Sequence, residues 1–151
     1  MKTPISQFFE SLGLPLRNIR NSWGASNGTT ILLRSWSDRY DAKTKQVVLL
    51  RPQHEYLDGQ GPGRSEREEQ LRRLWAGGMV GYVVLVNAKD TNARPREIVD
   101  FRRDIVWNIV ELHGNADGSV VAILGDLVPV DEIARHAATH ALGPTLGSPP
   151  F

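Results

Sequence analysis

Residues 17–38 decide how the first part of the chain folds, and they read Arg17-Asn-Ile-Arg-Asn-Ser-Trp-Gly-Ala-Ser-Asn-Gly-Thr-Thr-Ile-Leu-Leu-Arg-Ser-Trp-Ser-Asp38. The segment from Thr29 to Ser37 is rich in apolar and β-branched residues and predicts a strand. Side chains alternate along a strand, so Arg34 and Trp36 are expected on one face. The polar, turn-rich segment before it holds a second tryptophan, Trp23. The stretch therefore combines two indole rings with several guanidinium groups.

Periodic and alternating patterns predict elements on both sides of this strand. Helices are predicted after an N-cap at Thr3, after a capping box from Ser65 to Glu68, and from Asp131 to about Ala141 with Asp131 as its cap. Further strands are predicted at residues 46–51, 80–88, 105–112 and 119–124. An irregular loop is expected at 58–63, a helix stop at Gly77-Gly78, a hairpin turn at 115–118 and a turn at 125–129.

These elements predict an α+β domain of about five strands and three short helices. The strands follow one another as antiparallel neighbours with short connections, so we expect a small curled or barrel-like, mostly antiparallel sheet. The length of 151 residues suits one globular domain, which we expect to span residues 1–141. Residues 142–151 are rich in glycine and proline and are expected to form a flexible tail.

Composition narrows the protein class. The absence of cysteine excludes disulfides and thiolate metal sites, and no apolar run approaches the roughly 20 residues that cross a bilayer. We therefore expect a cytoplasmic protein without a membrane partner. The net charge of +1 conceals a net of +5 over residues 14–54 and −3 over residues 101–151. Such polarity is compatible with one basic face that meets a polyanion, and also with ordinary solvated charge.

Aromatic rings beside guanidinium groups suit a nucleobase pocket, because a base can stack and its phosphates need cations. We expect Trp23 and Trp36 to stack on a base and Asp90, after the 80–88 strand, to accept from an exocyclic amine. The arginines expected to contact phosphates are Arg17, Arg20, Arg34, Arg51, Arg94 and Arg96. Alternatively, Trp23 caps the edge of the core, Asp90 is a turn residue and the arginines are solvated. Trp75 and Trp107 are expected in the core.

Catalytic and metal-binding patterns are weak. His136 and His140 have the spacing of a zinc-protease helix, but Ala137 stands where that motif has glutamate. Neither a serine nucleophile elbow nor a nuclease-like arrangement of carboxylates is recognisable. These observations favour a binding protein over an enzyme, and we expect neither a cofactor nor a metal ion.

The order of the predicted elements resembles that of PUA-like domains, the superfamily that holds the EVE, YTH, ASCH and SRA readers of modified bases. The resemblance covers roughly residues 20–128 and rests on Gly28-Thr-Thr-Ile-Leu-Leu-Arg34, the helix after Ser65, Tyr82-Val-Val-Leu-Val86 and the hairpin around Asp117-Gly118. It implies recognition of a base, and it implies a nuclease as partner or fused domain.

Three hypotheses follow for the function. The first is a nucleic-acid-binding module for DNA or RNA that reads a modified base, in bacterial restriction or defence or in RNA metabolism. The second is a protein-interaction or scaffold subunit that uses the tryptophan and arginine surface. The third is a small enzyme of unrecognised type that uses Asp90, His54 or His113. The sequence does not decide the oligomeric state.

Overall fold

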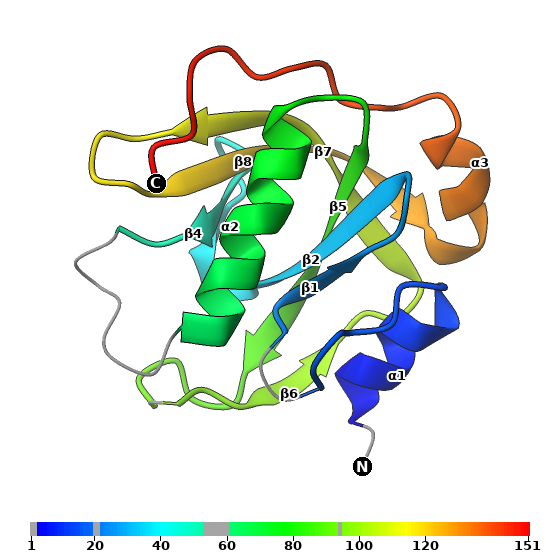
Figure 1. The fold of residues 1–151 in the computed structure, drawn as a ribbon. Helices are drawn as coiled ribbons and strands as arrows, with labels where there is room; N and C mark the ends of the chain where they lie inside the picture. Colours follow the sequence, from blue (N-terminus) through cyan, green and yellow to red (C-terminus); the bar gives the residue numbers. More distant parts are fainter. Residues whose placement is uncertain (1–2, 20–21, 53–60, 94) are drawn as a thin grey trace.

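The computed structural model describes residues 3–19, 22–52, 61–93 and 95–151 (Figure 1). Its helices are α1 (Pro4–Ser11), α2 (Gly61–Trp75) and α3 (Ile133–Ala137), with short 3-10 turns at η1 (Ser37–Arg39) and η3 (Val130–Glu132). Its strands are β1 (Gly24–Ser26), β2 (Thr30–Trp36), β3 (Tyr40–Asp41), β4 (Gln46–Leu50), β5 (Val80–Ala88), β6 (Ile98–Phe101), β7 (Ile105–Gly114) and β8 (Val120–Pro129).

The eight strands of the described residues form one mixed, open sheet in the order β1-β2-β5-β7-β8-β4-β3, and β6 pairs with β5. Strands β2 and β5 run parallel, from Thr30 opposite Val80 to Trp36 opposite Val86. The α+β class is therefore right. The expected small, barrel-like and mostly antiparallel sheet of about five strands is wrong, because β2 pairs with the distant strand β5 across a connection that contains α2.

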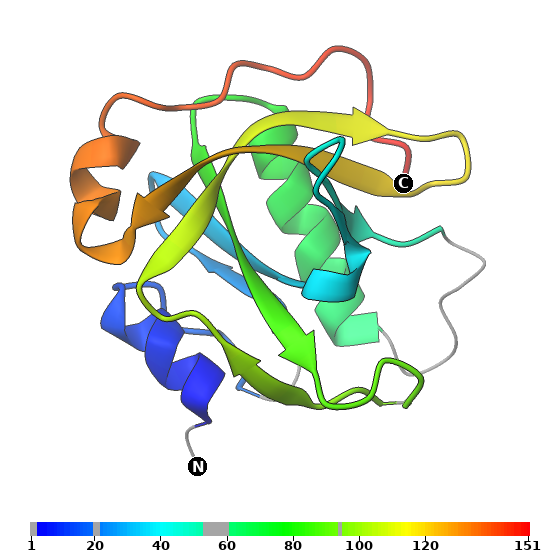
Figure 2. The same cartoon turned by 180° about the vertical axis from the view of Figure 1, so that it is seen from behind.

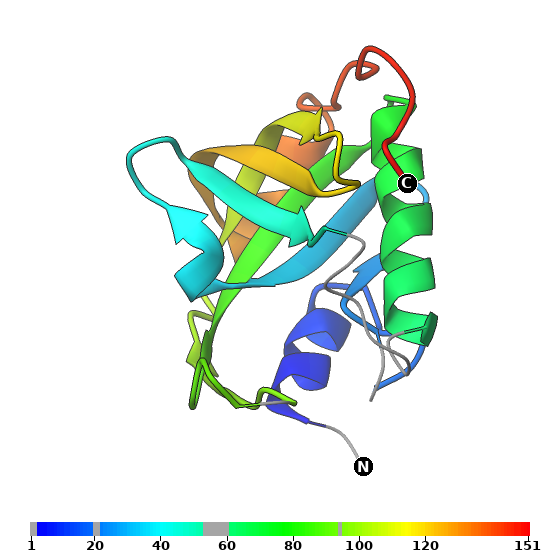
Figure 3. The same cartoon turned by 90° about the vertical axis from the view of Figure 1, so that its left-hand side faces the viewer.

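Helices cover both faces of the sheet (Figures 1 and 2). On one face, Leu71 and Leu74 of α2 pack with Val83 of β5 in the first core cluster. On the opposite face, Phe9 of α1 and Ile133 of α3 belong to a second cluster. Figure 3 shows α2 standing along one side of the bent sheet. None of the described helices combines the length and the apolar character needed to span a bilayer.

Elements specified by local sequence agree with their predictions. Thr3 caps α1 through a bond of 3.2 Å from the Ser6 amide, and Ser6 Oγ accepts the Thr3 amide in return at 2.8 Å. Strand β5 has the predicted bounds. Gly77 and Gly78 end α2 with φ angles of 83° and 91°, a region that glycine adopts readily.

Two helix boundaries differ from the prediction. Helix α2 begins at Gly61, so Ser65 lies inside it and the capping box at Ser65 is wrong. Proline near the start of a helix has a preset φ angle, which explains how the Gly-Pro-Gly sequence enters the first turn. Of the loop expected at 58–63, residues 58–60 lie outside the described residues.

The C-terminal part of the chain also differs. Helix α3 ends at Ala137, and its N-cap Glu132 makes no side-chain capping bond, so the longer helix capped by Asp131 is wrong. The turn expected at 125–129 is part of strand β8.

Residues 142–151, expected as a flexible tail, lie against the end of α2 (Figure 1). The indole Nε1 of Trp75 donates to Gly147 O at 3.0 Å, and the Leu142 amide donates to Met79 O at 2.8 Å. The guanidinium of Arg72 lies 5.0 Å from the ring centre of Phe151. The segment thus covers Trp75, which is only 6% exposed.

Arg67 of α2 joins strands that have no ladder between them. Its guanidinium donates to Leu49 O of β4 at 2.6 Å, to Trp23 O at 2.8 Å and to Arg34 O of β2 at 2.7 Å. The carbonyl of Leu49 lies at a register shift in the pairing of β4 with β8. Arg67 is only 3% exposed, so these carbonyls receive their donor where water has little access.

We predict that Arg67→Met lowers the free energy of unfolding by about 3 kcal/mol, because buried carbonyls lose a charged donor while the apolar volume stays similar. Urea denaturation followed by tryptophan fluorescence measures the change. Arg72→Met, on the same helix, is the control and is expected to cost less than about 1 kcal/mol. A loss for Arg67→Met no larger than for the control would contradict a bridging role.

Candidate functional site

The predicted residues Arg34, Trp36 and Arg96 come together at the carboxyl end of β2. The guanidinium carbons of Arg34 and Arg96 lie 5.8 Å and 5.2 Å from the centre of the Trp36 ring. Arg96 also donates two hydrogen bonds to Asp38, at 2.7 Å and 2.9 Å. These bonds hold the pKa of Asp38 below its usual range. The indole therefore already stacks with the protein's own cations.

Charge in this cluster is compensated in part, at Arg96. The carboxylate of Asp38 neutralises Arg96, whose side chain is only 9% exposed. Burial lowers the pKa of Arg34, since a charged group loses solvation in the protein. With Arg96 paired and both arginines stacked on Trp36, the cluster has fewer groups to offer to phosphates than its sequence indicates.

The second predicted stacking residue, Trp23, lies just before β1. Its ring is half-buried, and the guanidinium carbon of Arg67 lies 5.7 Å from its centre. The Trp23 carbonyl accepts from both Arg67 and the Arg34 amide. These contacts give Trp23 a structural role at the edge of the sheet.

The remaining predicted residues are dispersed. Arg17 is 79% exposed beside α2, and Arg51 is half-buried directly after β4. Asp90 is exposed, and its Oδ1 accepts from the Asn92 amide at 2.9 Å, as in a turn. Arg20 and Arg94 lie outside the described residues.

The sequence interpretation missed an aromatic pair that joins β3 to β7. The rings of Tyr40 and Trp107 have centroids 5.4 Å apart, and both side chains are half-buried against the first core cluster. Leu127, which is 43% exposed, lies directly opposite Trp107 on β8. Opposite residues share a face of the sheet, so Tyr40, Trp107 and Leu127 form one partly exposed surface, called here the Tyr40–Trp107 surface.

Uncompensated positive charge follows Tyr40 along the chain. Lys43 and Lys45 are exposed in the connection between β3 and β4. Within the described residues neither lysine has an acidic side chain within ion-pair distance. The sequence feature that could have indicated this surface is a tyrosine followed closely by two lysines, in Tyr40-Asp-Ala-Lys-Thr-Lys45. Trp107, predicted in the core, packs against the core but is partly exposed.

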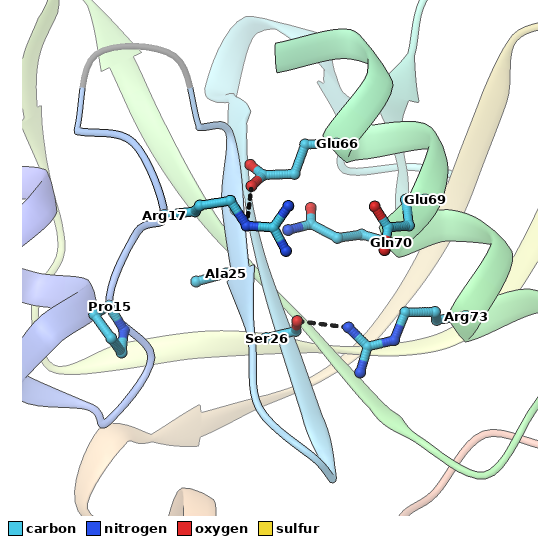
Figure 4. Close-up of a pocket in the computed structure, with 9 residues that line it drawn as sticks. Pro15, Arg17, Ala25, Ser26, Glu66, Glu69, Gln70 and Arg73 are labelled. Atoms are coloured by element: carbon cyan, nitrogen blue, oxygen red, sulfur yellow. Dashed lines mark hydrogen bonds and ion pairs between the residues drawn. The ribbon is translucent and has the colours of Figure 1, made fainter. Parts of the chain in front are cut away.

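A separate cleft of about 130 Å³ lies between β1, α2 and residues 15–17 (Figure 4). Its polar lining comes from Arg17, Ser26, Glu66, Glu69, Gln70 and Arg73. Arg73 donates to Ser26 Oγ at 2.6 Å, and Arg17 Nε lies 3.9 Å from Glu66 Oε2. The lining therefore presents both signs of charge within a small volume.

Tyr82 and two histidines form a polar contact between β5 and the segment that includes α3. The hydroxyl of Tyr82 lies 2.6 Å from His136 Nδ1, and the rings of His136 and His140 stack with centroids 3.7 Å apart. Burial raises the pKa of Tyr82 to about 12. Burial and the neighbouring His140 lower the pKa of His136, against the opposing effect of Asp126. In the described part of the chain no three metal-ligating side chains gather to hold an ion.

With this geometry in place, we compared the chain with known proteins. No family model, curated protein or solved structure matches it. The resemblance to PUA-like domains therefore stays a prediction.

The lowered pKa of His136 predicts that stability falls in acid. The unfolded histidine has a pKa of about 6.5, so below that pH the unfolded chain binds more protons than the folded one. The contribution is fully present above pH 6.5 and is lost as the pH falls through the folded pKa. Urea midpoints measured between pH 7.5 and pH 5 should show a smaller decrease for His136→Gln than for the parent. An equal decrease for His136→Gln and the parent would contradict a contribution from His136.

Proposed function

We propose that the protein binds single-stranded nucleic acid at the Tyr40–Trp107 surface. The observation that carries the proposal is the partly exposed aromatic pair, whose centroids are 5.4 Å apart, next to a connection that bears Lys43 and Lys45. Bases stack on aromatic side chains whatever their sequence, and lysines contact the phosphates that follow. The proposed site combines aromatic and basic residues, as the sequence predicts, but it uses other residues than Trp23 and Trp36.

Exposure of the cations supports this location over the Trp36 cluster, because Lys43 and Lys45 are exposed whereas Arg34 and Arg96 are partly buried. Two acidic residues, Asp38 and Asp41, lie close to the two lysines in the sequence. Asp38 is paired with Arg96. Asp41 Oδ1 accepts the Lys43 backbone amide at 2.9 Å, which orders the connection and leaves both ammonium groups for a ligand. Tyr40 and Trp107 have partly exposed rings, whereas Trp36 is stacked with two guanidinium groups.

Fluorescence anisotropy with labelled single-stranded DNA, RNA and duplex DNA tests the proposal. The oligonucleotides carry unmodified or methylated cytosine and adenine, and each is measured at two salt concentrations. We expect single strands to bind more tightly than duplexes, and the affinity to fall as salt rises, because phosphate contacts release counterions. A preference for one methylated strand would add recognition of a modified base.

Matched variants separate stacking from charge. Trp107→Leu should lose about 5- to 100-fold in affinity, while Trp107→Phe should retain most of it. Lys43→Glu and Lys45→Glu should each weaken binding and reduce the salt dependence, whereas Arg135→Glu on α3 makes the same charge change away from this surface. Equal losses for the lysine variants and Arg135→Glu would contradict a localised interface. No binding at micromolar protein would overturn the function and favour a protein partner.

A further inference from the structure

Two buried acceptors in the cleft between β1 and α2 lack hydrogen-bond partners. Among the described residues, Gln70 Oε1 and Glu66 Oε1 are both buried and receive no donor. Gln70 is only 5% exposed and lines the cleft. A buried acceptor without a donor costs free energy comparable to a lost hydrogen bond, so both atoms are complementary to a ligand that carries N–H groups.

Opposite charge stands next to these acceptors. Arg17 Nε is 3.9 Å from Glu66 Oε2, yet the Arg17 side chain is 79% exposed and therefore free to turn toward a bound anion. Arg73 is held on the other side of the cleft by its bond to Ser26 Oγ (Figure 4). A cation-binding carboxylate and an anion-binding guanidinium thus lie about as close as two neighbouring groups of one small molecule.

Strand β1 contributes backbone groups to the same cleft. The Arg34 amide donates to Trp23 O at 2.9 Å and the Asn27 amide to Thr30 O at 3.0 Å, so residues 23 and 27 occupy hydrogen-bonded positions toward β2. The direction of the backbone N–H and C=O groups alternates along an antiparallel strand. Those of Gly24 and Ser26 therefore point to the free edge of the sheet. Both residues line the cleft.

Gly24 keeps this floor open. A Cβ atom at this position would lie 3.0 Å from Gln70 Oε1 and 2.8 Å from Leu32 O. Any side chain would therefore crowd both the glutamine and the neighbouring strand. The glycine therefore lets the Gln70 side chain pack against the backbone of β1, with Oε1 buried at the floor of the cleft.

We propose that this cleft binds a free α-amino acid. Its ammonium group donates to Gln70 Oε1 and Glu66 Oε1, and its carboxylate is paired with Arg17. With Arg17 3.9 Å from Glu66, an ammonium and a carboxylate on the same carbon match the two charges, as in this class of ligand. The site is distinct from the Tyr40–Trp107 surface in all its residues, so either proposal stands without the other.

Thermal unfolding in the presence of each of the twenty L-amino acids at 10 mM, followed by calorimetric titration of those that raise Tm, tests the proposal. At least one is expected to bind with a Kd at or below the millimolar range. For that amino acid, the amine without the carboxylate and the acid without the ammonium should bind at least tenfold more weakly. No stabilisation by any amino acid, or equal binding of the amine alone, would overturn the proposal.

Two variants test the assignment of groups. Arg17→Gln, at an exposed position, should leave Tm of the free protein unchanged and lose at least tenfold in affinity. Gln70→Leu removes an unpartnered buried acceptor, so it should maintain or raise Tm of the free protein while abolishing binding. A marked fall in Tm for Gln70→Leu would show a structural glutamine and would contradict the proposed role. Binding that survives both variants would place the ligand elsewhere.

Discussion

The guanidinium of Arg67 is the contact on which the arrangement of this protein depends. Strands β2 and β4 are neighbours without a backbone ladder, and Arg67 supplies donors to carbonyls on both sides of that gap. Ser35 adds one bond of 2.7 Å from its hydroxyl to Val48 O. Arginine suits this position because its five N–H groups diverge in one plane, so one side chain can serve several acceptors. Together with the buried Leu71 and Leu74, the bridge orients α2, whose other residues Glu66, Gln70 and Arg73 line the cleft.

How much of the fold could be predicted depended on whether the determining contacts were local. The Thr3 cap of α1, the glycines after α2 and the turn at residues 115–118 are each specified within a few residues, and the structure agrees. The parallel pairing of β2 with β5 is not, since it joins segments some fifty residues apart. The residue pattern of a strand does not specify which other strand it pairs with. Arg67 was equally hidden, because it occurs among six other charged residues of its helix.

The tryptophans show why the candidate site was harder to predict than the strands. Arginine beside tryptophan in a sequence is equally compatible with a ligand pocket and with an internal cation–π contact, since both use the same ring face. The structure gives the internal contacts, with Arg34 and Arg96 on Trp36 and Arg67 on Trp23. Partial exposure of Trp107 depends on where β3 places Tyr40, a tertiary relation that strand alternation does not contain.

Packing alone does not explain why the cleft beside β1 has a glutamine at position 70. An isosteric leucine at position 70 would remove an unpartnered acceptor from a nearly buried site, and such replacements are commonly neutral or stabilising. Glu66 likewise keeps one buried oxygen without a donor, although its other oxygen faces Arg17 at 3.9 Å. In the proposed complex, a single ligand ammonium donates to both atoms, which belong to residues four apart on one helix. The unpartnered oxygens raise the free energy of the free protein. Only a ligand that donates hydrogen bonds to them recovers this free energy, so they make the cleft selective for such a ligand.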